Sequence, residues 1–98
     1  MSDTVMIIAE STAAQGKAEE VVRLIEDVVE PTRAEAGCVR YELMRDLDDD
    51  HRIILIEEWA DQSARDAHLA SEHLVRMFRE MEPLLAAQGR GTRVARIA

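Results

Sequence analysis

The stretch HRIILIEEWADQSARDAHLASEHL, residues 51–74, contains the transition that decides the fold. Its first nine residues are rich in β-branched side chains, which favour a strand, and the polar ADQS segment then offers caps for a helix. Because side chains alternate across a strand, Ile54 and Ile56 point to one side while Ile53 and Leu55 point to the other. Both faces of this strand are therefore apolar, and each needs a covering layer.

The segment after this strand is predicted to form a helix that bends once. Asp61 or Ser63 is a suitable N-cap, and Ser63 followed by Asp66 resembles a capping box. Ser71 is a suitable cap for a second helical piece, so we expect a bend near Ser71. The apolar stripe of that second piece consists of Leu74, Met77, Phe78 and Met81.

Residues 4–11 are predicted to form the first strand, and residues 17–37 a helix. Pro31 lacks a backbone donor and crowds the preceding turn, so we expect a kink or break there before Gly37 ends the segment. The apolar positions of this helix recur at helical spacing and face one side: Val21, Leu24, Ile25, Val28 and Thr32.

A hairpin is predicted from residues 38–46 and 51–59, and a last strand from residues 91–98. The acidic run at residues 46–50 lacks the central glycine and terminal glutamate of a calcium-binding EF-hand loop, which makes a solvated turn the preferred interpretation. The predicted order is β-α-β-β-α-β.

This order predicts an α+β, ferredoxin-like subunit, in which a four-stranded antiparallel sheet carries both helices on one face. The apolar side chains on the other face predict a partner, which we expect to be a second copy in a two-fold homodimer. A chain of 98 residues has room for one domain, which we take as residues 1–98.

Composition limits the classes of partner. Acidic residues outnumber basic ones by 20 to 12, and the basic residues are scattered, so nucleic acid and anionic membranes are not expected partners. No apolar run is long enough to span a bilayer, and the start of the chain lacks a signal-peptide pattern, so we expect a cytoplasmic protein. The single cysteine, Cys38, excludes an internal disulfide and a thiolate cluster for a metal.

Candidate site residues lie where the third strand meets the following helix. Trp59 shares a strand face with Glu57, and His68 lies beside the small residues of the helix, where an imidazole opposite an indole can frame a cavity. A structural role is the alternative for each of them, with Trp59 plugging the core. His73 points about 140° away from His68 in a straight helix and joins it only if the chain bends. Tyr41 shares a strand face with Val39 and Leu43, and its default interpretation is a residue of the core.

Two histidines and a glutamate also suggest a non-haem iron site, although their spacing does not enforce one. The chain has no P-loop, dinucleotide fingerprint, nucleophile elbow or HExxH zinc motif. Any chemistry must therefore use acid–base groups, the substrate itself, or a cofactor that no linear motif announces, and we assign no residue as a metal ligand.

The segments GKAEEVVRLI, EPTRAEAGCVRYELMRD and EEWADQSARDAHLASEHL, followed by a short closing strand, resemble the antibiotic biosynthesis monooxygenase (ABM) family, including its quinol monooxygenase-like members. The resemblance spans nearly the whole chain. It implies a dimeric α+β barrel with a substrate cavity between sheet and helices. It also implies a monooxygenase that oxidises a hydroxylated aromatic compound or quinol with dioxygen, with no cofactor, because the substrate acts as its own reductant.

The resemblance implies that His68 is the base or orienting hydrogen-bonding group and that Trp59 stacks on the substrate ring. Around them we expect five substrate-binding residues: Ser11, Tyr41, Glu57, His73 and Phe78. Ser11 stands where haem-degrading relatives have an asparagine, which disfavours haem degradation because a serine has no amide. A non-catalytic dimeric barrel that binds a small ligand or responds to stress remains the principal alternative.

Overall fold

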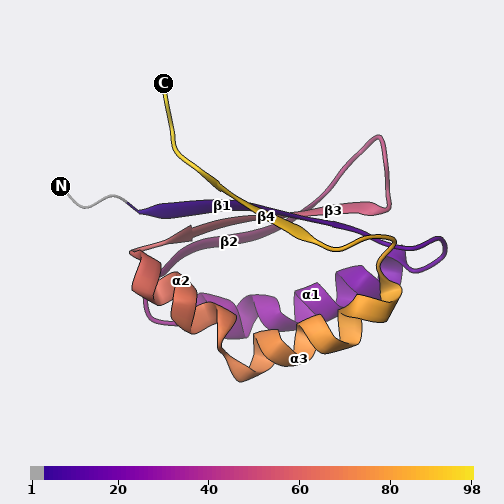
Figure 1. The fold of residues 1–98 in the computed structure, drawn as a ribbon, viewed down its shortest axis with the longest axis horizontal. Coiled ribbons are helices and arrows are strands. Elements are labelled where there is room, and N and C mark those ends of the chain that lie inside the picture. Colours follow the sequence, from indigo (N-terminus) through magenta and orange to yellow (C-terminus); the bar gives the residue numbers. More distant parts are fainter. Residues whose placement is uncertain (1–3) are drawn as a thin grey trace.

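A four-stranded antiparallel sheet covered on one face by helices forms the structure, a computed structural model that describes residues 4–98 (Figure 1). The sheet order is β2-β3-β1-β4. The strands are β1 (Val5–Thr12), β2 (Cys38–Arg45), β3 (Arg52–Trp59) and β4 (Arg90–Val94). The helices are α1 (Ala18–Arg33), α2 (Gln62–Leu69), α3 (Glu72–Met81) and the short 3₁₀ helix η1 (Glu82–Leu84). The predicted ferredoxin-like α+β fold is confirmed; residues 1–3 of the predicted domain lie outside the described residues.

The central strand β3 alternates as predicted. Ile53, Leu55, Glu57 and Trp59 are buried against the helices, while the residues between them remain partly exposed on the other face. The buried side chains of β3 pack against the apolar face of α1, where Val21, Ile25, Val28 and Thr32 are buried. The core residue Leu55 and the carboxylate of Glu57 therefore lie on the same face of β3, so a polar group enters the apolar layer between sheet and helices.

Helix α1 runs past Pro31 to Arg33, so the predicted break at Pro31 is wrong. Pro31 lies in the last turn, where its missing N–H frees only the carbonyl of Asp27, an exposed residue that water can serve. After the helix, Gly37 adopts a φ of 83°, a conformation that favours glycine.

The predicted bend between the two later helices is confirmed. Asp61 caps α2 by accepting a hydrogen bond from the backbone N–H of Ala64 at 2.8 Å, so the predicted capping box at Ser63 is not formed. Ser71 is extended, with φ −66° and ψ 148°, which separates α2 from α3. Its hydroxyl donates to the carbonyl of His68 at 2.7 Å, which also accepts the backbone N–H of Ser71 at 3.1 Å.

Two local predictions in the hairpin had different outcomes. The acidic run forms a turn, in which the Asp46 carboxylate accepts hydrogen bonds from the N–H groups of Asp48 and Asp49. The prediction that Tyr41 and Val39 share a strand face is wrong. A bulge between Cys38 and Arg40 turns Val39 outward, where it is 57% exposed.

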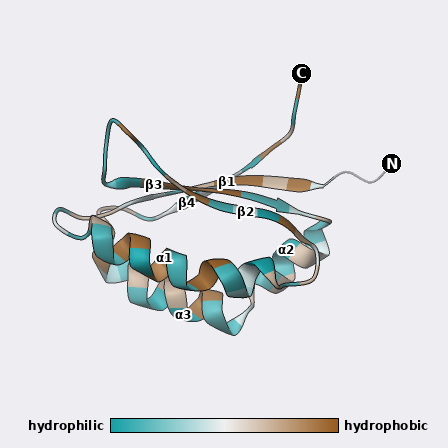
Figure 2. Cartoon of the chain, turned by 180° about the vertical axis from the view of Figure 1, so that it is seen from behind, coloured by the Kyte–Doolittle hydropathy of each residue, from teal (hydrophilic) through white to brown (hydrophobic). Residues whose placement is uncertain are grey.

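The second face of the sheet carries no helix in the described part of the chain (Figures 1 and 2). Strand register puts Ile8 opposite Ile56 and Met44 opposite Ile54, so their side chains gather on this face. Met44 is 42% exposed, and Val94, opposite Met6, is 38% exposed. None of the helices among residues 4–98 has the length and apolar character needed to cross a membrane.

Candidate functional site

A cavity of about 760 Å³ lies between the sheet and the helices. Apolar side chains make up much of its wall, among them Ile25, Leu55, Leu74, Met77, Phe78 and Met81. Polar groups from different elements interrupt this wall: Ser11, Tyr41, Glu57, Arg65 and His68. An apolar hollow with a few convergent polar groups has the character of a small-molecule site.

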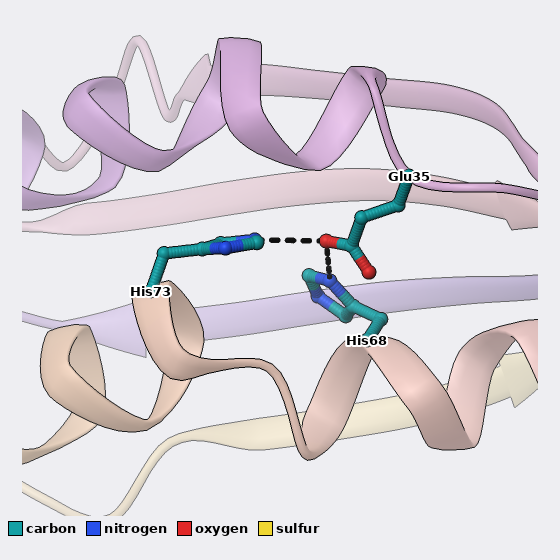
Figure 3. Close-up of side chains that lie close together, drawn as sticks. All are labelled: Glu35, His68 and His73. Carbon is teal, nitrogen blue, oxygen red and sulfur yellow. Dashed lines mark hydrogen bonds and ion pairs between the residues drawn. The ribbon is translucent and has the colours of Figure 1, made fainter.

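His68 connects this cavity to a partly buried cluster of ionisable groups (Figure 3). Its Nδ1 lies 2.9 Å from Oε2 of Glu35, and Nε2 of His73 lies 2.8 Å from the same oxygen. Because an ionised carboxylate only accepts hydrogen bonds, each imidazole donates its N–H to Glu35. A His68 ring that donates through Nδ1 and carries no second proton has its lone pair on Nε2, and no protein hydrogen bond to this atom is present within residues 4–98.

Three elements bring this cluster together. Glu35 follows α1, His68 is in the last turn of α2, and His73 is in the first turn of α3 (Figure 3). The α1–β2 loop passes so close to α2 that a Cβ at Gly37 would lie 2.5 Å from the Cβ of Ala64. This close approach holds Glu35 over the next turn of α2, where His68 lies.

Trp59 supports the back of His68. Their ring centroids are 4.6 Å apart and the rings are tilted by 32°, while the Trp59 residue is 0% exposed and does not line the cavity. The indole Nε1 donates to Oε1 of Glu57 at 3.0 Å. The indole is therefore enclosed by protein and packs on the imidazole, and the expected stacking of Trp59 on a substrate ring stays a prediction.

Glu57 and Arg65 form a second polar group at the cavity wall. Nε of Arg65 lies 3.5 Å from Oε1 of Glu57, and the two side chains are only 15% and 4% exposed. The Arg65 Nε is buried and has no hydrogen-bond partner within residues 4–98. Glu57 is thus already engaged by an indole and a guanidinium, whereas Arg65 retains donor capacity beside the cavity.

Tyr41 stands between the two polar groups. Its ring centroid lies 5.4 Å from that of His68 and 6.4 Å from that of Trp59, both in edge-on contact. Burial, followed by the carboxylates of Glu57 and Glu35, raises the pKa of the Tyr41 phenol well above its ordinary value. Tyr41 therefore stays protonated at neutral pH.

The structure assembles most of the predicted residues around one hollow. Ser11, Tyr41, Glu57, His68 and Phe78 line the cavity. His73 contacts the Glu35 cluster instead of the cavity wall, and Trp59 lies behind it. The sequence analysis missed Glu35 and Arg65; the α2 position of Arg65, three residues before His68, was the one available indication.

Two clusters of side chains among residues 4–98 have metal-ligand atoms within 4.8 Å of one another. One consists of Glu35, His68 and His73, and the other of Asp49, Asp50 and His51 in the exposed hairpin turn. Only the first cluster contains a buried histidine.

The fold and the cavity define a ferredoxin-like α+β protein with a hollow between its sheet and its helices. The chain belongs to the antibiotic biosynthesis monooxygenase family, whose model matches residues 4–80. This agrees with the resemblance found in the sequence segments.

Individual relatives resemble nearly the full chain. The crystal structure of PA3566 from Pseudomonas aeruginosa is 40% identical, with a TM-score of 0.92 over 100% of this chain and 98% of that one. The structure of Rv0793 from Mycobacterium tuberculosis is 26% identical, with a TM-score of 0.91 over 98% of this chain and 97% of that one. An uncharacterized Synechocystis protein, sll1783, is 27% identical over 98% of this chain, which spans 65% of that protein's length.

Proposed function

We propose that this protein is a monooxygenase that uses dioxygen to oxidise a hydroxylated aromatic compound or quinol without a cofactor. Membership of the monooxygenase family supports the reaction class. The observation that carries the proposal is His68, whose Nδ1–H is held by the Glu35 carboxylate while its ring lines an apolar cavity. This is the arrangement of a general base oriented by a second residue.

The cavity suits an aromatic substrate. Its volume of about 760 Å³ falls in the range of roughly 300–1,000 Å³ that is common for small-molecule pockets. Met77 and Met81 give the wall polarisable and adaptable surfaces, and Phe78 is a half-exposed aromatic ring at its edge. An extended aromatic ring would displace water from these surfaces and leave its hydroxyl to the few polar groups.

The first step is removal of a proton from the substrate hydroxyl by Nε2 of His68. A free phenol and a free imidazole differ by about 3.5 pKa units, so this transfer costs about 5 kcal/mol in water. The Glu35 carboxylate, 2.9 Å from Nδ1, stabilises the imidazolium that forms, and thereby lowers this cost. Glu35 is thus a positioning residue that acts through His68.

The oxyanion that remains on the substrate needs donors. Arg65, Tyr41 and Ser11 line the cavity and carry N–H and O–H donors for it. The electron-rich anion then transfers electrons to dioxygen. In an anthrone-type substrate, a ring CH₂ becomes C=O: one oxygen atom enters the product, the other leaves as water, and the substrate supplies all four electrons and both hydrogens of that water.

The test is dioxygen consumption by the purified chain across a panel of quinols and anthrone-type phenols, measured against the autoxidation blank. We expect at least one compound to be consumed above the blank, and we expect His68→Gln to lower kcat by roughly 10²–10⁴-fold, the usual contribution of a general base. Glu35→Gln should lower kcat less, because the amide can still accept a hydrogen bond from Nδ1.

The control is His51→Gln, which changes a histidine in the hairpin turn remote from the cavity and should turn over like the unmodified chain. If ligands bind without any dioxygen consumption, the protein is a binding module and the oxygenase proposal is wrong. Full activity in His68→Gln would refute the assignment of the base.

A further inference from the structure

We propose that Glu35, His68 and His73 form a binding site for one divalent transition-metal ion, with Zn²⁺ as the preferred ion. The ligand atoms are Oε2 of Glu35, Nδ1 of His68 and Nε2 of His73. The site lies on the Nδ1 side of His68, whereas the cavity is lined by the His68 ring but by neither Glu35 nor His73 (Figure 3). This proposal departs from the prediction of no metal made from the sequence.

The geometry of the three atoms is close to that of a coordination sphere. Metal–ligand distances for histidine nitrogen and carboxylate oxygen are about 2.0–2.2 Å, so two ligands of one tetrahedral ion lie about 3.3–3.6 Å apart. Oε2 of Glu35 is 2.9 Å from Nδ1 of His68 and 2.8 Å from Nε2 of His73. All three atoms lie within 4.8 Å of one another, so exchange of the two bridging protons for one cation requires each histidine nitrogen to move about 0.5 Å away from Oε2 of Glu35.

The donor set selects the class of ion. Two imidazoles and one carboxylate suit Zn²⁺, Co²⁺, Ni²⁺ and Fe²⁺, whereas Mg²⁺ and Ca²⁺ prefer oxygen ligands. Three protein ligands leave at least one position for water. The hydroxyls of Ser71 and Thr32 lie 3.3 and 3.4 Å from Nε2 of His73, where they can hydrogen-bond to that water.

The three ligands are held firmly yet remain accessible to an ion. His68 is 2% exposed at its side chain, Glu35 is 16% exposed and His73 is 26% exposed, so an ion can enter past His73. The ligands come from the α1–β2 loop, α2 and α3. A bound ion would therefore cross-link three elements of the helical layer and raise the thermal stability of the chain.

Metal binding would also act on the proposed oxygenase, and this consequence rests on the proposed function. An imidazole that coordinates a cation through Nδ1 carries its proton on Nε2. His68 would then present an N–H to the cavity in place of a lone pair and could not accept the substrate proton. Zn²⁺ is thus expected to inhibit turnover, whereas its binding is measured without any substrate.

The test is calorimetric titration of the untagged full-length chain with Zn²⁺, together with Co²⁺ titration followed by visible absorption. We expect one ion per chain, a melting temperature that rises with Zn²⁺ concentration, and a Co²⁺ spectrum typical of nitrogen and oxygen ligands. His73→Gln and Glu35→Gln should each weaken Zn²⁺ binding at least tenfold.

The matched control is His51→Gln, which removes the only histidine of the exposed Asp49–Asp50–His51 cluster and should leave Zn²⁺ affinity unchanged. Loss of binding in His51→Gln with full binding in His73→Gln would move the site to the hairpin turn and overturn the proposal. No binding by the unmodified chain would overturn it as well. Neither result depends on whether the protein is an oxygenase.

Discussion

Replacement of Trp59 by phenylalanine tests whether the indole supports the site from behind or contacts a ligand. Trp59 is 0% exposed, stacks on His68 and donates a hydrogen bond to the buried carboxylate of Glu57. We expect Trp59→Phe to reduce the free energy of unfolding strongly. A residue that stacks on a ligand at the cavity surface would affect ligand binding more than stability.

Three contributions to the lost stability can be estimated. The smaller ring buries about 40 Å² less apolar surface, which corresponds to about 1 kcal/mol. The void of about 35 Å³ left by the indole adds about 1 kcal/mol. Loss of the hydrogen bond to an ionised carboxylate costs about 1.5–3 kcal/mol. The sum, about 3.5–5 kcal/mol, is a large fraction of the 5–15 kcal/mol that is usual for a domain.

The assay is urea unfolding followed by far-ultraviolet circular dichroism, since the variant lacks the only tryptophan of the chain. Phe78→Leu is the matched control, because Phe78 is an aromatic residue that is 48% exposed and should lose less than about 1 kcal/mol. A loss below about 1 kcal/mol in Trp59→Phe, at an unchanged dependence on urea, would refute the packing role. A raised KM at nearly normal stability would instead indicate ligand stacking.

Three further predictions concern pH, backbone conformation and assembly. The pKa of the Tyr41 phenol is higher in the folded chain than in the unfolded chain, so the stability that this residue contributes is present below about pH 10 and is lost as pH rises toward the folded pKa. Between pH 9 and 11 the free energy of unfolding should fall by about 1.4 kcal/mol more in the unmodified chain than in Tyr41→Phe, and parallel curves would contradict this. In denaturant unfolding, Gly37→Ala should reduce the free energy of unfolding by at least about 1 kcal/mol more than Gly16→Ala, because both glycines have positive φ but only a Cβ at Gly37 would meet Ala64. Equal losses in the two variants would show that the loop can move away from α2. We propose that a second copy of the chain covers the uncovered sheet face, so light scattering at micromolar concentration should give the mass of a dimer, and a monomer would refute the proposal. Ile56→Asp on this face should give a monomer, whereas Val75→Asp on α3 should leave the dimer unchanged.

The sequence determined the order of the elements and the buried faces of β3 and α1. Alternation in residues 51–59 correctly separated Leu55 from Ile56, and helical spacing identified the buried side of α1. These patterns succeed because one strand or helix repeats with a fixed period, so a residue's face depends only on its own segment. Ser71 was also recognisable as a break, since a capping residue acts on its immediate neighbours.

Only the tertiary structure decided which side chains meet. Glu35 lies 33 residues before His68 in the chain, and their contact depends on how closely the loop at Gly37 packs on α2. Strand alternation placed Trp59 on the same face as Leu55, but its contact with His68 depends on how α2 packs at the end of β3. Distances between elements arise from the packing of side chains across layers, and that packing is a property of the assembled core, which no single segment contains.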